Sequence, residues 1–257
     1  MYRPRVIPCL LLKGKGLVKS VKFKDYTYIG DPINAVKIFN DKKADELVFL
    51  DITASKEKRL ISLDFVNKVG DEANMPFAVG GGIRSIGNIR DILNAGAEKV
   101  IINTYAAENP KFVKEASDEF GSSTIVISVD VKKNIFGKNQ IFIYAGSKST
   151  VYDTIEYVKL MEEMGAGELI VNSIDRDGTM IGYDIDLIRS VSDTVLIPVV
   201  ALGGAGKYDD LISAYINGYA SAVAAGSMFV YHGPRKAVLI NYPTHEELKS
   251  LFPGNLT

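Results

Sequence analysis

The sequence predicts a single (β/α)8 TIM barrel spanning residues 1–257. Three observations predict it. The length is the usual size of one such barrel. Short runs rich in Val, Ile, Leu and Ala alternate with longer amphipathic stretches, as expected of parallel strands covered on both faces by helices. The two halves of the chain also resemble each other, so the barrel is expected to be a two-fold repeat of half-barrels.

The strands are expected at the apolar, β-branched runs. In chain order they are predicted at Arg5–Leu12, Glu46–Ile52, Pro76–Gly80, Lys99–Asn103, Thr124–Asp130, Glu168–Ser173, Ile197–Leu202 and Ser221–Gly226. Helical patterns lie between them, at Asp31–Lys43, Ile86–Ala95, Pro110–Phe120, Val151–Met164, Ile185–Val191 and Tyr208–Asn217. Lys13–Tyr28 and Val131–Thr150 are predicted to be longer loops or small hairpins after the first and fifth strands.

The internal repeat appears as matched segments about half a chain apart. Pro76–Arg84 is echoed by Pro198–Gly206, and Phe49–Thr53 by Asn172–Thr179. The repeat predicts half-barrels at about 1–120 and 121–230, followed by a divergent C-terminal tail, 231–257. Because no linker or low-complexity segment separates them, one domain is expected.

Composition excludes several classes of function. The net charge of −1 gives no general attraction to nucleic acid or to an anionic membrane. A single cysteine, Cys9, excludes an intramolecular disulfide and is expected to be a small core residue. With only His232 and His245 besides, we expect no metal site and no cofactor. No signal peptide or long apolar run is evident, so the expected location is the cytoplasm.

Glycines and hydroxyl residues follow four of the predicted strands. They are Gly80–Gly82, Asn103–Thr104, Gly203–Gly206 and Gly226–Ser227. Active sites of such barrels form at these carboxyl ends, and glycine lets backbone N–H groups approach an anion closely. The symmetric arrangement predicts two phosphate sites and a ligand phosphorylated at both ends. Glycines that only form tight turns are the alternative.

Carboxylates also stand at strand ends: Asp51, Asp130, Asp175 and Asp177. An unpaired charge there implies a solvated mouth or a functional group. Asp130 closes an otherwise apolar run and is expected to project into the mouth. Pairing with a nearby lysine, or capping of the next helix, remains the alternative for each carboxylate.

Charged residues mark the opposite end of the barrel. Strands one, two, four and six are predicted to begin with Arg5, Glu46, Lys99 and Glu168. Alternating charges at these positions could form a ring that closes the barrel floor. Ordinary solvated residues at the starts of strands are the alternative.

The chain resembles the cyclase subunit of imidazole glycerol phosphate synthase over at least residues 1–230. The resemblance rests on Arg5–Leu10, Gly30–Pro32, Ala44–Ser55, Val79–Arg84, Lys99–Thr104, Gly165–Glu168, Ser173–Thr179 and Gly203–Gly206. It implies a TIM barrel that binds a bisphosphorylated nucleotide at one face and docks a glutaminase subunit at the other, with ammonia passing along the axis.

The resemblance also implies roles for particular residues. The ammonia gate corresponds to Arg5, Glu46, Lys99 and Glu168. One phosphate site corresponds to Gly82, Asn103 and Thr104, and the other to Asp177, Gly178, Gly204, Gly226 and Ser227. Catalytic residues correspond to Asp130 and to a loop lysine, Lys19.

One position departs from the family pattern. The aspartate that pairs with Asp130 in general acid–base catalysis is replaced by Leu11. Leucine cannot transfer a proton, and one positioned acid or base typically contributes about 10²–10⁴-fold in rate. The replacement, together with the divergent tail, resembles a paralogous branch linked to surface-polysaccharide pathways, in which such barrels are thought to feed ammonia to a sugar amidotransferase that makes acetamidino groups.

Three hypotheses follow. The chain is an ammonia-channelling synthase subunit for another product, a working cyclase of histidine biosynthesis that has recruited another group, or a non-catalytic scaffold that conducts ammonia to a third protein. A related sugar isomerase would share the barrel and phosphate sites but would not explain the four gate residues.

Overall fold

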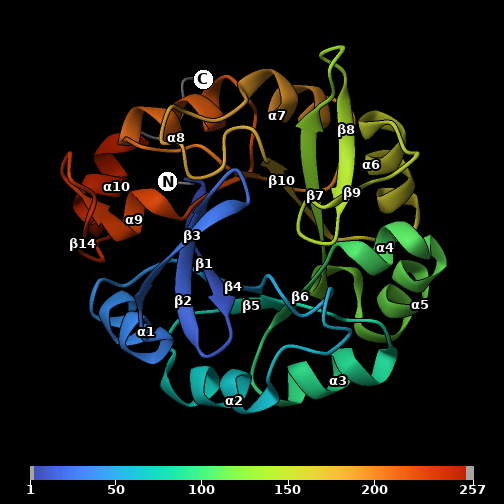
Figure 1. The fold of residues 1–257 in the computed structure, drawn as a ribbon, viewed down its shortest axis with the longest axis horizontal. Coiled ribbons are helices and arrows are strands. Elements are labelled where there is room, and N and C mark those ends of the chain that lie inside the picture. The colour runs from blue at the N-terminus through green and yellow to red at the C-terminus, as the bar shows by residue number, and fades with distance from the viewer. Residues whose placement is uncertain (1–2, 253–257) are drawn as a thin grey trace.

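The structure, a computed structural model, describes residues 3–252 and confirms the predicted barrel (Figure 1). Eight parallel strands pair in sequence, and the last returns to the first with Arg5 opposite Ala222, so the barrel is closed. They are β1 (Arg5–Lys13), β4 (Leu47–Asp51), β5 (Phe77–Gly80), β6 (Lys99–Ile102), β7 (Ile125–Lys133), β10 (Glu168–Ser173), β11 (Val199–Leu202) and β12 (Ala222–Ala225).

Helices surround the barrel (Figure 1). They are α1 (Pro32–Asp41), α2 (Leu63–Glu72), α3 (Ile86–Asn94), α5 (Pro110–Phe120), α6 (Thr154–Glu163), α7 (Ile185–Ser192), α8 (Tyr208–Ile216) and α10 (His245–Leu251). Shorter segments are α4 (Thr104–Glu108), α9 (Ser227–Val230) and the 3-10 turn Ser122–Thr124. The predicted helices are confirmed, with boundaries that shift by up to three residues.

The C-terminal tail contributes to the core. Leu248 of α10 is buried, and Phe252 packs edge-on against Tyr215 of α8 with ring centroids 5.6 Å apart. Tyr242 packs edge-on against Phe39 of α1. The tail therefore fills the gap between α8 and α1 (Figure 1), while residues 253–257 of the predicted tail lie outside the described range.

Strand alternation divides the core into two clusters. On β1, Val6 and Leu10 pack in the large cluster between barrel and helices, whereas Ile7 and Cys9 belong to a separate cluster inside the barrel. Successive side chains of a strand point to opposite faces, which explains the division. The inner cluster is completed by Val48, Ala78, Ile101, Val126, Ile170, Val200, Leu202, Ala222 and Ala224. The axis of the barrel is thus lined by apolar side chains.

Three hairpins extend from the strand framework. The first is formed by β2 (Gly16–Val21) and β3 (Lys24–Gly30), and the last by β13 (Tyr231–His232) and β14 (Ala237–Val238). Between them, β7 pairs with β8 (Asn139–Ile143), which pairs with β9 (Lys148–Ser149). The prediction that the fifth strand ends at Asp130 was wrong: β7 runs to Lys133, because its last residues find an antiparallel partner in β8.

Within residues 3–252, no helix combines the length and the apolar character that a membrane crossing requires. Four of the helices begin at polar side chains that cap their first turns. The side chains of Asp31, Ser62, Ser85 and Asp153 accept backbone N–H bonds in the first turns of α1, α2, α3 and α6, which satisfies donors that a helix start leaves free.

Candidate active site

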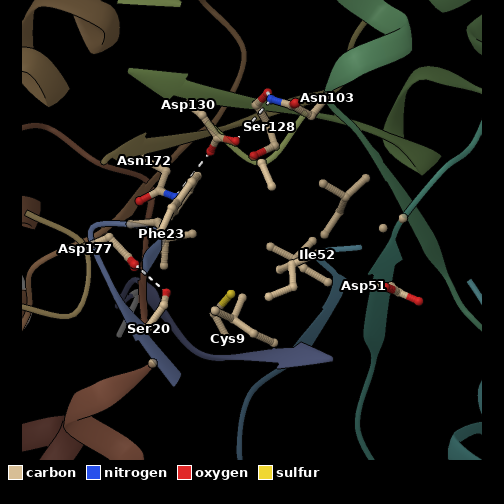
Figure 2. A pocket seen from close by; sticks show the side chains of 18 of the residues that line it. Cys9, Ser20, Phe23, Asp51, Ile52, Asn103, Ser128, Asp130, Asn172 and Asp177 are labelled. Atoms are coloured by element: carbon tan, nitrogen blue, oxygen red, sulfur yellow. Dashed lines mark hydrogen bonds between the residues drawn. The ribbon is translucent and has the colours of Figure 1, made fainter. Parts of the chain in front are cut away.

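A pocket opens at the carboxyl ends of the barrel strands (Figure 2). Residues predicted for both phosphate sites line it: Gly82, Asn103, Thr104, Asp177, Gly178, Gly204, Gly226 and Ser227. Leu11, Lys19, Asp51 and Asp130 line it as well. The fold therefore brings the predicted mouth residues together, with the exception of Asp175. The carboxylate of Asp175 instead accepts the backbone N–H of Lys133 at 2.9 Å.

Asp130 is the central polar group of the pocket. Its side chain is buried, and each carboxylate oxygen faces an amide: Asn172 Nδ2 lies 3.2 Å from Oδ1 and Asn103 Nδ2 lies 3.3 Å from Oδ2 (Figure 2). Burial and, to a lesser extent, the charge of Asp177 raise the pKa of Asp130 to about 7, although the hydrogen bond from Asn172 opposes the shift. Such a group can accept or release a proton near neutral pH.

The β1–β4 side of the pocket is apolar. Leu11 lies opposite Leu50 of β4 and Val18 of β2 in the strand register, and it packs against the inner cluster of the barrel. Cys9 and Ile52 line the same side. Asp51 also lines the pocket, but its carboxylate binds Arg59 at 2.6 Å and points away from the centre in Figure 2. Asp51 is thus held as a structural carboxylate.

Lys19 was predicted to be a loop residue, but it lies within strand β2 and is buried. Its ammonium group donates to the carbonyl oxygen of Cys9 at 2.7 Å. It lies beside β12, since a Cβ added to Gly226 would be 2.0 Å from Nζ. Burial lowers the pKa of Lys19, and Cys9 and Asp177 oppose that shift. The buried cation lies next to one of the two predicted phosphate sites.

The β2–β3 hairpin contacts the second predicted phosphate site directly. Ser20 Oγ lies 3.2 Å from the Asp177 carboxylate, and the Lys22 N–H donates to the Asp177 carbonyl oxygen at 2.9 Å. Gly178 has a φ of +69°, and a Cβ there would lie 1.9 Å from the Ser20 carbonyl oxygen. Burial raises the pKa of Asp177, while Lys19 lowers it. Asp177 and Gly178 thus hold the hairpin against the pocket.

Close packing accounts for glycine at the other predicted anion positions. A Cβ on Gly82 would lie 1.8 Å from the Arg59 carbonyl oxygen, and one on Gly204 would lie 2.3 Å from that of Gly182. Both glycines have positive φ. Backbone packing alone therefore explains why these two residues are glycines. The evidence for the predicted phosphate sites is that their residues line one pocket.

The four residues predicted for the floor form a ring of ion pairs at the opposite end of the barrel. Arg5 pairs with Glu46 and with Glu168. Lys99 Nζ lies 3.3 Å from Glu46 and 2.9 Å from Glu168. Both glutamates are buried, which excludes the alternative of ordinary solvated residues. Each acid is shared by two cations, which offsets the desolvation of buried charge.

The polar residues of the pocket that the sequence analysis missed include Ser20, Ser55, Arg84, Ser128 and Asn172. Strand parity could have identified Ser128, because it lies two residues before Asp130. Asn172 is brought opposite Asp130 by the parallel register of β7 and β10. Among the residues that the structure describes, no group of three or more His, Cys, Asp or Glu side chains is arranged to hold a metal ion.

Comparison with known proteins agrees with the fold. The profile of the family described as histidine biosynthesis protein matches residues 5–234. The chain is 45% identical over 254 residues to a provisionally named imidazole glycerol phosphate synthase subunit HisF of Leptospira borgpetersenii, covering 98% of this chain and 100% of that protein.

Two further relatives show similar agreement. A provisionally named subunit hisF2 of Pseudomonas aeruginosa is 45% identical over 248 residues, 96% of this chain and 99% of that protein. The imidazole glycerol phosphate synthase subunit HisF of Alkaliphilus metalliredigens is 42% identical over 232 residues, 90% of this chain and 92% of that protein. The chain therefore belongs to the histidine biosynthesis protein family, as a HisF-like member related to the cyclase subunit of imidazole glycerol phosphate synthase.

Proposed function

We propose that this chain is the synthase-type subunit of a two-component glutamine amidotransferase. It receives ammonia from a glutaminase docked at the floor of the barrel and binds a bisphosphorylated ligand at the mouth. Cyclisation is lost or severely slowed, because Leu11 stands where the family has an aspartate. The observation that carries the proposal is a complete four-residue ring at one end of the axis and half of an acid–base pair at the other.

The floor supports the first part of the proposal. The ring closes the axis with alternating charges, and the apolar inner cluster lies directly beyond it. An apolar passage favours neutral ammonia over ammonium, because burying an unpaired charge is strongly unfavourable. Arg5, Glu46, Lys99 and Glu168 would act as the gate by exchanging ion-pair partners as ammonia enters.

The mouth supports the second part. Lys19 is a buried cation beside Gly226 and Ser227, which suits one phosphate group. Gly82, Asn103 and Thr104 line the same pocket and are proposed to hold the other. Asp130, with its raised pKa, is proposed to accept the proton that ammonia loses as it forms a bond to carbon.

The names of the relatives support the proposal that this chain is a paralogue of the histidine-biosynthesis cyclase subunit and not that subunit itself. The names of the Pseudomonas aeruginosa and Vibrio vulnificus relatives carry the numbers 2 and 3. We propose that the chain serves the synthesis of acetamidino sugars, with a sugar amidotransferase as a further partner. We also propose that the barrel consists of two half-barrels, at about 1–120 and 121–230. Positive φ angles at the matching positions Gly81–Gly82 and Gly203–Gly204 support this division.

A genuine cyclase of histidine biosynthesis is the second candidate. It is favoured by the 42% identity to the Alkaliphilus metalliredigens subunit, whose name carries no qualification, and by the presence of Asp130 and Lys19 in the pocket. In that case another group would have to replace the proton transfer that Leu11 cannot perform.

An isotope experiment tests the proposed passage of ammonia. The chain and its glutaminase are supplied with amide-¹⁵N glutamine in a buffer containing unlabelled ammonium, together with the remaining enzymes of the pathway. We expect the aminated product to carry ¹⁵N in excess of the free ammonium pool. Equal labelling of product and pool would refute the passage. If an Asp130→Asn variant supports full product formation, the chain is instead a non-catalytic scaffold that conducts ammonia to a third protein.

A further inference from the structure

We infer that Asn172 is a positioning residue for Asp130, which fixes the carboxylate in the pocket and favours its proton-accepting form. Nothing in the family resemblance assigns Asn172 a role. The inference concerns the same site as the proposed function, and it rests on that proposal only for the use made of Asp130.

The first observation is the contact itself. Asn172 stands on β10 opposite Asp130 in the parallel register, and its Nδ2 donates to Asp130 Oδ1 at 3.2 Å. Asn103, from the end of β6, donates to the other oxygen at 3.3 Å. Figure 2 shows the two amides on either side of the carboxylate. Two neutral N–H donors stabilise an ionised carboxyl more than a protonated one.

The second observation concerns the oxygen atom of the Asn172 side-chain amide. Asn172 Oδ1 is buried without a hydrogen-bond partner among the residues that the structure describes, and it lies 2.5 Å from where a Cβ on Gly203 would be. An unpaired buried acceptor is unfavourable. The opposite orientation would place this oxygen against the carboxylate, which is repulsive while Asp130 is ionised. The contact with Asp130 therefore sets the orientation of the amide.

Other ionisable groups share this environment. Asp177, on the loop after β10, raises the pKa of Asp130. Burial raises the pKa of Cys9 on β1 and of Tyr157 on α6, and the charge of Asp130 adds to both shifts, while Lys19 on β2 faces Cys9 and Asp177. With Leu11 across the pocket, no second carboxylate of a catalytic pair faces Asp130, and the amide of Asn172 makes the largest of the contributions that lower the pKa of Asp130 against the effect of burial.

The test is a carboxyl ¹³C NMR titration of Asp130 in the free, full-length chain. We expect the Asp130 titration to have its midpoint at about pH 7 in the wild type. Because a donor to the carboxylate is lost, Asn172→Leu should raise the midpoint by about half a pH unit or more. Asn172→Asp should raise it further, because two carboxylates then compete for one proton. Ser173→Ala, on the opposite face of the same strand, should leave it unchanged.

A midpoint in Asn172→Leu equal to that of the wild type overturns the inference. If Asn172→Leu does not fold, the nearly isosteric Asn172→Asp decides, and an unchanged midpoint in that variant has the same meaning. The titration needs neither glutaminase nor substrate. A failure of the proposed ammonia passage would therefore leave this result untouched, and the reverse also holds.

Discussion

Lys99 and Glu168 form a 2.9 Å ion pair at the floor of the barrel, although they start different strands, β6 and β10. Glu168 also pairs with Arg5, so removing its charge leaves two cations partly uncompensated. The pair links the stability of the barrel to the integrity of the proposed gate.

Glu168→Gln should therefore destabilise the fold. Removing one partner of a buried pair costs about 3–5 kcal/mol, and we expect a value toward the lower end because Arg5 is half-buried. The measurement is the free energy of unfolding in urea. Glu163→Gln, the same chemical change at an exposed position of α6, is the control and should have little effect. Equal effects of the two variants would contradict the role of the ring.

Asp130→Asn should stabilise the protein more at pH 8 than at pH 5. Burial raises the pKa of Asp130 to about 7. When folding raises the pKa of a carboxyl group, the group contributes stability at pH values below its pKa in the unfolded chain. That stability is lost as the pH rises through its pKa in the folded chain. Near pH 8 the wild type carries a buried charge, at a cost on the order of a few kcal/mol, and the variant does not.

Urea unfolding at the two pH values measures this difference. Asp71→Asn, at an exposed position of α2, serves as the control and should show no such dependence on pH. A stabilisation by Asp130→Asn that is the same at pH 5 and pH 8 would show that Asp130 does not titrate in this range.

Gly178→Ala should release the β2–β3 hairpin from the pocket. The added Cβ would meet the Ser20 carbonyl oxygen at 1.9 Å, in addition to the strain of a φ of +69°. Gly137→Ala is the matched control, since Gly137 has a φ of +76° with nothing within 4 Å of an added Cβ. Strain alone costs about 1–2 kcal/mol in both variants. Hydrogen exchange of residues 16–30 should accelerate only in Gly178→Ala.

Lys19→Met should weaken anion binding without unfolding the chain. The buried ammonium hydrogen-bonds to the neutral carbonyl oxygen of Cys9, so its loss breaks no direct ion pair, although it removes a cation that lowers the pKa of Asp177. Losing a charged hydrogen-bond donor should lower the affinity for inorganic phosphate by roughly tenfold or more. Calorimetric titration measures this, with the exposed Lys15→Met as control. Unchanged phosphate affinity in Lys19→Met would place the anion elsewhere.

Much of the barrel follows from local sequence, because buried parallel strands need continuous apolar runs. Strand parity also places Arg5, Ile7, Cys9 and Leu11 on one face of β1. Predictions failed where distant partners decide the structure. The end of β7 depends on pairing with β8. Asp175 and Asp177 have different contacts, because Asp175 accepts a hydrogen bond from Lys133 of β7, whereas Ser20 of the β2–β3 hairpin donates to Asp177.

Other features depend on three-dimensional register. Without the family resemblance, the ring at the floor could not be distinguished from solvated charges, because its ion pairs form only when four strand starts lie at one level. Asn172 carried no motif of its own, and its contact with Asp130 arises from the pairing of β7 and β10. The tail lacked a recognisable barrel pattern, yet α10 completes the helical shell through Leu248.

The most direct test of the account is the rate at which the purified chain cyclises the histidine-pathway intermediate with saturating ammonium salt. Because Leu11 cannot transfer a proton, we expect a rate about 10²–10⁴-fold below that of a family member with both aspartates, and a substantial gain in Leu11→Asp. An ordinary rate from the unmodified chain would contradict the account and identify a working cyclase.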